Sequence, residues 1–205
     1  MTPADMPTRP RVEGDREQQV LDAALAVLAE VGYDRLTMEA VATRAKASKA
    51  TLYRRWSNKL TLVIDALVAQ KATPEPPDTG SLRGDLAAAY CGLGGLTDRE
   101  TVTRFTSVLT AIGRDPEFAE AYRTRVLGPK VAQAVTIFER ARARGELRDD
   151  LDVTLIAPAL PGIVLHRFLV LGEAPSPDLV DRVIDQIILP AAISTATGAD
   201  VTGSH

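Results

Sequence analysis

The sequence contains very few of the residues that build metal, redox and hydrolytic sites. It has one cysteine, Cys91, and two histidines among 205 residues. A single cysteine excludes an intrachain disulfide and favours a reducing compartment such as the cytoplasm. No His or Cys pair has metal-ligand spacing, no glycine-rich phosphate loop follows a strand, and two histidines provide no plausible Ser–His–Asp set. We therefore expect a protein that is not an enzyme and that needs no cofactor or metal.

Long apolar runs are also missing. The longest uncharged apolar stretch, 153–166, contains Pro158 and Pro161 and is too short to span a bilayer. The first fifteen residues lack the apolar segment of a secretory signal. Aromatic residues make up only 4% of the chain, but hydrophobic residues make up 45%, which is enough for a folded core.

The net charge of −3 is distributed unevenly along the chain. Seven basic residues and one acid, Glu39, lie between Arg35 and Lys59, so this segment carries +6 and the other 180 residues carry −9. The acidic total alone would argue against nucleic acid. A basic segment on an acidic body instead indicates a surface that faces phosphate, although a solvated helix face is the alternative interpretation.

The apolar spacing is helical, and no alternating strand pattern occurs. We therefore predict an all-α fold of about nine helices. Apolar residues three and four apart predict a first helix from Arg16 to Val31, which Gly32 ends. A fourth helix is expected from Lys59 to Lys71.

Between these two helices lies the pattern of a helix-turn-helix. Thr37 and Ser48 are suitable N-caps for two short helices, which the turn at Lys46 and Ala47 separates. The second of them, from Lys49, is rich in Lys, Arg, Thr and Tyr. Short paired helices with such a composition are typical of a DNA-reading module.

Proline and glycine residues divide the remainder of the chain. The segment 73–80 is rich in proline and is the best candidate for a boundary. We predict a disordered arm at 1–14, a helix-turn-helix DNA-binding domain with a linking helix at 15–72, a helical body at 80–197 and a disordered tail at 198–205. Pro129 should kink a long helix that starts after Asp115, and Pro190 should bend or end the last helix.

Several residues at fixed spacing resemble the DNA-binding domain of TetR/AcrR-type transcriptional regulators. The resemblance covers roughly residues 17–64. It is carried by Gly32-Tyr33, Thr37-Met38, Val41-Ala42, Ala45, Ser48, Thr51-Leu52-Tyr53-Arg54-Arg55-Trp56 and Lys59. It implies a three-helix reading domain followed by a helical ligand-binding and dimerisation domain. Lys46 departs from the family, which usually has glycine here. If this position needs a positive φ, lysine costs about 1 kcal/mol, unless a phosphate contact by Lys46 compensates.

The resemblance and the side-chain chemistry together assign DNA contacts. We expect Thr51, Tyr53 and Lys59 to touch DNA as the matching family positions do, with Tyr53 and Lys59 on phosphates. Lys49, Arg54 and Arg55 can read guanine, and of the two arginines we expect Arg55 in the groove and Arg54 on the backbone. The remaining candidates are hydroxyl residues at helix N-termini, which alternatively only cap, and basic residues near the turn, which are alternatively only solvated: Thr37, Ser48, Arg44 and Lys46.

The second half is where the resemblance places an effector and a dimer partner. Seven mostly apolar residues are candidates for lining an effector cavity, although ordinary core packing is the alternative for each: Tyr90, Phe105, Leu109, Phe138, Leu165, His166 and Phe168. For His166 a core histidine is favoured over a ligand contact, and Cys91 is expected to pack. The apolar stripe of the last helix predicts the homodimer interface at Val183, Ile184, Ile187 and Ile188.

These observations predict a cytoplasmic, homodimeric transcriptional regulator that binds a palindromic double-stranded operator. We expect a repressor that a small apolar effector releases from DNA. Two alternatives remain at this point: a helical small-molecule binding or carrier protein with an incidental basic face, and a DNA-binding regulator without an effector.

Overall fold

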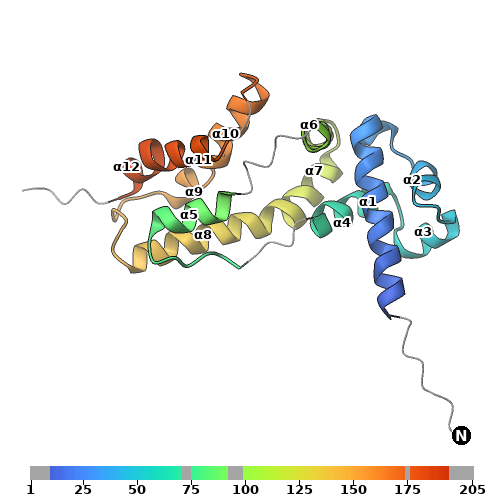
Figure 1. Ribbon diagram of the computed structural model, residues 1–205, viewed down its shortest axis with the longest axis horizontal. Helices are drawn as coiled ribbons and strands as arrows, with labels where there is room; N and C mark the ends of the chain where they lie inside the picture. Colours follow the sequence, from blue (N-terminus) through green and yellow to red (C-terminus); the bar gives the residue numbers. More distant parts are fainter. Residues whose placement is uncertain (1–9, 71–74, 92–98, 174–175, 194–205) are drawn as a thin grey trace, which may run out of the picture. The chain divides into compact units, whose positions relative to one another are not determined.

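The computed structural model describes residues 10–70, 75–91, 99–173 and 176–193. Within these ranges every regular element is a helix, and the only extended pairing is an isolated bridge between Leu147 and Ile193. Some helical segments follow one another in the sequence without an intervening loop, at 116–143 and at 177–192 (Figure 1). The predicted tail at 198–205 and the first nine residues of the predicted arm lie outside the described residues.

The first compact unit contains the helices α1–α4 together with α6, α7 and the π-turn η2. The bounds are α1 (Pro10–Arg35), α2 (Met38–Arg44), α3 (Lys49–Arg55), α4 (Lys59–Gln70), α6 (Arg99–Arg114), α7 (Pro116–Tyr122) and η2 (Arg123–Leu127). Sequence analysis predicted a separate body from residue 80 onwards. The structure instead groups α6 and α7 with the N-terminal helices, because α6 packs along α1 and α7 packs on α4.

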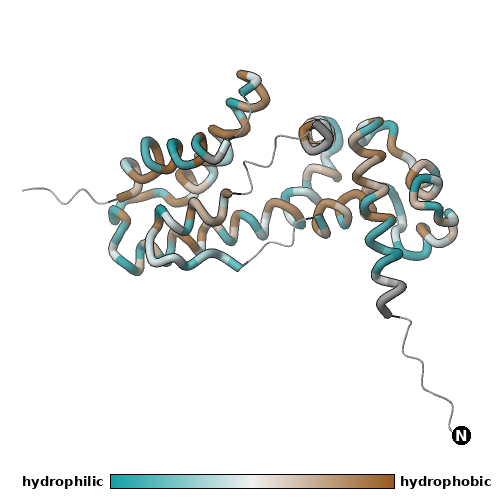
Figure 2. The backbone as a smooth tube through the Cα atoms, in the orientation of Figure 1, coloured by the Kyte–Doolittle hydropathy of each residue, from teal (hydrophilic) through white to brown (hydrophobic). Residues whose placement is uncertain are grey.

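Helix α1 begins earlier than its apolar pattern predicts. It starts at Pro10, inside the segment expected to be a disordered arm. Side-chain hydrogen bonds one turn apart, such as Gln18 to Asp22 at 2.8 Å, support its polar early turns, whereas its middle is hydrophobic (Figure 2). Gly32 adopts φ 75° and breaks the helical geometry where the sequence predicted the helix to end.

The core of this unit lies between α1, α2, α4 and the helices that cover them. Leu28 of α1, Leu52 of α3 and Leu62 of α4 are fully buried in it, as is Phe118 of α7. Leu52 and Trp56 are both buried, as their four-residue spacing predicted. The apolar face of α3 therefore anchors the helix, and its polar face is turned outward.

The second compact unit contains the C-terminal helices. The bounds are α5 (Leu82–Tyr90), α8 (Gly128–Ala143, which starts at the unit boundary), α9 (Val153–Ile156), α10 (Ala159–Leu169), α11 (Pro177–Val183), the π-turn η3 (Ile184–Ile188) and α12 (Leu189–Ala192). Its core is built around Phe138, Leu160, Val164 and Ile184. The N-terminus of α5 is fixed by Glu146, which accepts a hydrogen bond of 2.8 Å from the Leu82 N–H.

Both π-turns precede a proline by two residues. The η2 turn ends at Leu127 before Pro129, and η3 ends at Ile188 before Pro190. A proline inside a helix clashes with the carbonyl one turn earlier and cannot donate to it. A wider turn relieves this conflict, and helical residues follow each proline in the sequence. The predicted disturbances at Pro129 and Pro190 are thus present, and their local form is a π-turn.

Candidate nucleic-acid interface

The two short helices carry the hydroxyl caps that the sequence predicted. The Ala40 N–H donates to Thr37 Oγ1 at 3.1 Å, and the Thr51 N–H donates to Ser48 Oγ at 3.1 Å. The Ser48 and Thr51 hydroxyls also lie 2.8 Å apart. Both cap residues have extended backbone geometry, so each helix start is sharply defined.

Helix α2 ends in a left-handed turn. Lys46 has φ 50°, the only positive φ of a non-glycine residue in the described chain. Its N–H donates to the Thr43 carbonyl at 3.1 Å, and the Ala47 N–H donates to the Ala42 carbonyl at 2.9 Å. This pair of bonds is a Schellman motif with lysine at the position that favours glycine. Lys46 thus replaces the usual glycine of the family, and the turn is left-handed at this lysine.

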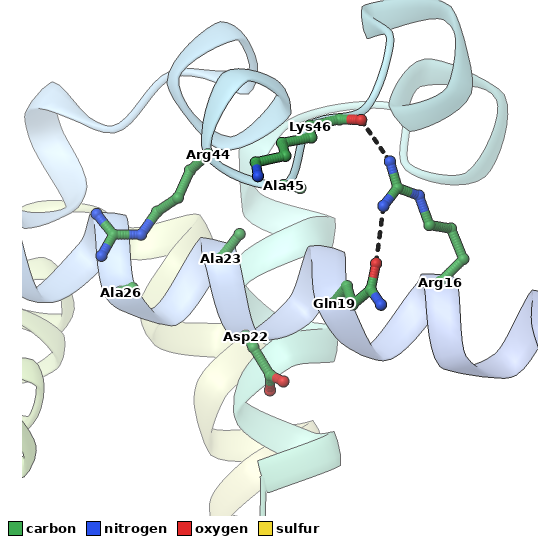
Figure 3. Close-up of a pocket in the computed structure, with 8 residues that line it drawn as sticks. All are labelled: Arg16, Gln19, Asp22, Ala23, Ala26, Arg44, Ala45 and Lys46. Carbon is green, nitrogen blue, oxygen red and sulfur yellow. Dashed lines mark hydrogen bonds between the residues drawn. The ribbon is translucent and has the colours of Figure 1, made fainter.

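Arg16 of α1 supports this turn from outside. Its Nη2 donates to the Lys46 carbonyl oxygen, and its Nη1 donates to Gln19 Oε1 at 2.7 Å (Figure 3). An open groove of about 430 Å³ lies between α1 and the end of α2. Its lining consists of Arg16, Gln19, Asp22, Ala23, Ala26, Arg44, Ala45 and Lys46. Three cations against one carboxylate give the groove a positive character that suits phosphate.

Three of the predicted DNA-binding cations are held in ion pairs with acids outside α3. Lys49 lies 2.5 Å from Glu39 of α2, and the Arg55 Nη2 lies 2.9 Å from Glu17 of α1. Arg44 pairs with Glu30, also on α1. The hydrogen bond from Lys49 lowers the pKa of Glu39 below its ordinary value. These side chains are between 38% and 64% exposed, so water screens the charges and each pair contributes little to stability.

Lys59, a predicted DNA-contacting residue, makes several contacts within the protein. Its Nζ donates to the carbonyls of Tyr33 at 2.9 Å and Asp34 at 3.3 Å, and lies 4.5 Å from the centre of the Tyr33 ring. Burial and the nearby carboxylates Asp115, Glu117 and Asp34 raise the pKa of Tyr33 to about 12, so its ring is neutral at physiological pH. Lys59 thus fixes the end of α1 to the start of α4 by a cation–π contact and two hydrogen bonds.

Tyr53 and Arg54 extend from the exposed side of α3. Tyr53 is 49% exposed although it is a large aromatic residue, and its neighbour Arg54 is exposed as well. On a helix, Tyr53 lies about 200° from Arg55, so these side chains leave α3 in different directions. The arrangement supplies a phenol and two guanidinium groups at different angles around one exposed helix.

The buried side of α3 is tied to α4 and to η2. The indole Nε1 of Trp56 donates to Asp65 Oδ2 at 2.8 Å, and Arg125 Nη2 donates to Asp65 Oδ1 at 2.7 Å. The sequence predicted that Trp56 lies in the core, but neither its bond to Asp65 nor the bond between Asp65 and Arg125 was predicted. Sequence reasoning also missed Arg16 and Glu17, because hydrogen bonds between residues 30 or more positions apart leave no periodic signal.

The seven effector candidates are divided between the two units. Phe105 and Leu109 lie on α6 in the first unit, and the other five belong to the second. Phe138 is fully buried in the second core, whereas Leu109 is 37% exposed. Tyr90, Phe105, Leu165 and Phe168 are half-buried. Burial raises the pKa of Tyr90 above its ordinary value.

Two side chains differ from their predicted surroundings. His166, expected in the core, is exposed, because Leu160 and Val164 occupy the inward face of α10 and His166 lies on the opposite face. Cys91, expected to pack, is also exposed, and its Sγ donates to the Ala88 carbonyl at 3.1 Å. It stands one residue beyond α5, where the helix no longer holds it against the core.

Nowhere among the described residues do three or more His, Cys, Asp or Glu side chains form a group that could hold a metal ion. None of the helices placed in the structure is long and apolar enough to cross a membrane.

Two capped helices around a tight turn, with an exposed basic second helix, define a helix-turn-helix DNA-binding protein. Comparison with known proteins specifies the family. Residues 20–66 match the model for bacterial regulatory proteins of the tetR family, and residues 76–187 match the tetracyclin repressor-like C-terminal domain. The chain belongs to the TetR family of transcriptional regulators.

Relatives match over nearly the whole chain. An uncharacterised HTH-type transcriptional regulator of Mycobacterium tuberculosis is 35% identical over 95% of this chain and 96% of its own length. The DNA-binding transcriptional repressor TetR of Mycobacteroides abscessus is 36% identical over 85% of this chain and 92% of its own. Among solved structures, the flavonoid-responsive regulator FrrA matches with a TM-score of 0.66 and 26% identity, over 89% of this chain and all of that one.

Proposed function

We propose that this transcriptional regulator is a repressor that a small apolar molecule releases from its operator. DNA binding through the helix-turn-helix is the family's activity, and a relative that is 36% identical is a repressor by name. The observation that carries the proposal is the exposed cationic helix α3 on a rigid, capped support. Tyr53, Arg54 and Arg55 extend from it, and the Ser48 cap and the buried Leu52 fix its position.

An effector is supported by relatives and by composition. One structural neighbour, 26% identical, is flavonoid-responsive by name. The candidate lining residues Tyr90, Leu165 and Phe168 are half-buried and carry no charge at neutral pH, which suits an apolar or weakly polar ligand. Such a molecule lowers operator affinity only if it binds the released state more tightly than the DNA-bound state.

A homodimer is required because one helix-turn-helix reads only a few base pairs. Members of this family typically act as dimers. Two copies related by a two-fold axis would read a palindromic site, with half-site centres about 34 Å apart or at a multiple of that spacing. Each copy would present the same surface to the other.

The structure changes the residues that we assign to the dimer interface. Val183, Ile184 and Ile188 were predicted there, but all three are buried in the core of their own protomer. Only Ile187 is available, at 43% exposure. The η3 turn explains the difference, because its five-residue repeat, with the Leu189 N–H bonded to the Ile184 carbonyl, rotates Ile187 away from the inward stripe.

We assign the interface to the outer stripe of α9–α10, together with Ile187. The stripe contains Leu155, Pro158, Gly162, His166 and Leu169, which are spaced three or four residues apart and are all exposed. Leu155 is 75% exposed, which is unusual for a leucine in a folded protein. A side chain at Gly162 would meet no atom within 4 Å, so a second helix can approach its backbone closely.

Selection of bound DNA from a random pool tests the function directly. A palindromic consensus would support a dimeric reader, and its half-site spacing would measure the separation of the two α3 helices. If about eight phosphates are neutralised per dimer, the logarithm of affinity should fall against the logarithm of salt concentration with a slope near −7. Failure to enrich any sequence, together with a salt-independent affinity, would refute the proposal.

A further inference from the structure

The early turns of α1 contact both sides of the reading helix. Arg16 donates to the Lys46 carbonyl in the turn before α3, and Glu17 pairs with Arg55 in the last turn of α3. Adjacent residues of one helix thus brace the start and the end of another. The two contacts join residues 30 and 38 positions apart.

The Glu17–Arg55 pair has a geometry that restricts the arginine. Arg55 Nη2 donates to Glu17 Oε1 at 2.9 Å, and the side chains are 64% and 38% exposed, with Arg55 the more exposed. A guanidinium is planar and carries five N–H donors in fixed directions. A carboxylate on a stable helix therefore restricts the positions and orientations that the guanidinium adopts, and the Arg55 side chain stays 64% exposed.

We propose that Glu17 is a positioning residue, which orients the Arg55 guanidinium for a bidentate hydrogen bond to O6 and N7 of a guanine in the operator. The inference rests on the proposed operator binding and deepens it. Arginine paired bidentately with guanine is the commonest specific contact in the major groove. The pair with Glu17 persists in the complex, and the guanine occupies a different edge of the same guanidinium.

Holding Arg55 in place before DNA binds reduces the conformational entropy that its side chain loses on binding. A long side chain that is already held in its bound orientation loses fewer rotamers on binding, so more of the contact appears as affinity. The benefit applies only where a guanine presents both acceptors in the right place. Phosphates accept from many directions, so non-cognate DNA gains little from a fixed guanidinium plane, and the difference between cognate and non-cognate affinity increases.

The second ion pair of α3 provides an internal comparison. Lys49 pairs with Glu39 at 2.5 Å, so this carboxylate is equally close to a cation of the same helix. An ammonium is a compact charge with three rotatable donors and no plane to orient. Glu39 therefore neutralises charge without positioning a base contact, and Glu39→Gln becomes a matched control for Glu17→Gln.

The experiment measures binding of the full chain to the selected operator and to copies in which each G·C pair of the half-site is replaced in turn. Arg55→Ala first identifies the base pair that Arg55 reads. In the Glu17→Gln variant, the ratio of the affinities for the original and the replaced base pair should then fall roughly 3- to 10-fold per half-site. This is the range expected for one immobilised side chain. Discrimination at the other base pairs should be unchanged.

Two further variants separate positioning from charge. The first is Asp15→Asn, at an exposed residue two positions before Glu17 on α1. It also removes one negative charge, so it should raise the affinity for all DNA sequences alike. Glu39→Gln should behave in the same way. In an Arg55→Lys background, which retains the charge without the plane, Glu17→Gln should have no selective effect.

Two outcomes would overturn the assignment while the operator function stands. One is that Glu17→Gln raises every affinity as Asp15→Asn does, which would make Glu17 a simple repulsive charge. The other is an equal loss of discrimination in the Arg55→Lys background, which would indicate a general disturbance of α3. If the wild-type chain prefers no sequence at all, the proposed function itself fails and the role of Glu17 fails with it.

Discussion

The indole Nε1 of Trp56 donates a hydrogen bond of 2.8 Å to Asp65 Oδ2, which joins the end of the reading helix α3 to the middle of α4. The other oxygen of Asp65 accepts from Arg125 in η2 at 2.7 Å. One carboxylate therefore links three elements of the first unit. The buried indole would have an unsatisfied donor without it.

Removing this carboxylate should be costly. Asp65→Ala is expected to lower the free energy of unfolding by about 1–3 kcal/mol, because it leaves the Trp56 N–H buried without an acceptor. Asp65→Asn, which retains an acceptor, should cost less. Urea unfolding of both variants and of Arg125→Ala measures this. Equal losses for Asp65→Asn and Asp65→Ala would contradict the role of the indole bond.

Lys46 should show opposite effects on stability and on DNA binding. Glycine adopts φ 50° without the strain of a Cβ atom, so Lys46→Gly should increase stability by roughly 1 kcal/mol. The loss of a cation from the α1–α2 groove should weaken DNA binding and reduce the steepness of its salt dependence. Lys46→Ala is the control, because it removes the charge and retains the strained turn. A stability gain in both variants would disprove the strain argument.

Lys59 and Tyr53 are both expected to touch phosphate, but only one of them also supports the fold. Lys59→Ala should weaken DNA binding and lower stability by about 1.5 kcal/mol, since it removes the hydrogen bonds to Tyr33 and Asp34. Tyr53→Phe should weaken binding and leave stability within about 0.5 kcal/mol, since the side chain is half exposed. Thermal unfolding and binding titrations of both variants separate these effects.

Acid should weaken the second unit through Asp85. This buried carboxylate accepts from the Thr79 N–H at 2.6 Å and pairs with Arg144 at 3.0 Å. Burial by itself raises the pKa of Asp85, but hydrogen bonds from Thr79 and Arg144 outweigh it and lower that pKa below the ordinary value. Its stabilisation is therefore complete above the unfolded-state pKa near 3.9 and is lost as pH falls through the lower folded-state pKa.

A variant without the carboxylate tests this pH dependence. Asp85→Ala should cost about 1–3 kcal/mol at pH 7, because the Thr79 N–H loses its acceptor, whereas Arg144 keeps Asp78 and Glu146 as partners. The difference from wild type should shrink as the pH falls towards 2. Calorimetry at a series of pH values measures both curves, and parallel curves across the acidic range would exclude Asp85 as the titrating group.

The proposed dimer interface predicts different outcomes for substitutions of exposed and of buried residues in the second unit. Ile187→Glu and Leu155→Glu should yield folded monomers by light scattering, because both side chains are exposed on the proposed interface. Ile184→Glu should instead unfold the second unit, because its side chain is fully buried. A persistent dimer in the double variant at 155 and 187 would place the interface on another surface.

The sequence by itself determined the local elements, because their signals lie within a few residues. Thr37 and Ser48 cap the helices that they were expected to cap, and Leu52 and Trp56 are buried as their spacing predicts. The uneven charge distribution and the spacing of residues 32–59 were also sufficient to identify the family.

Tertiary structure decided everything that depends on which surfaces meet. The last helix has a regular apolar stripe, yet a π-turn before Pro190 rotates Ile187 outward and leaves Ile184 in the core. Likewise, no local pattern reveals that Glu17 meets Arg55, or that Asp65 meets both Trp56 and Arg125. Periodicity reports which face of a helix is apolar, whereas packing decides what that face contacts and which charged residues come close enough to pair.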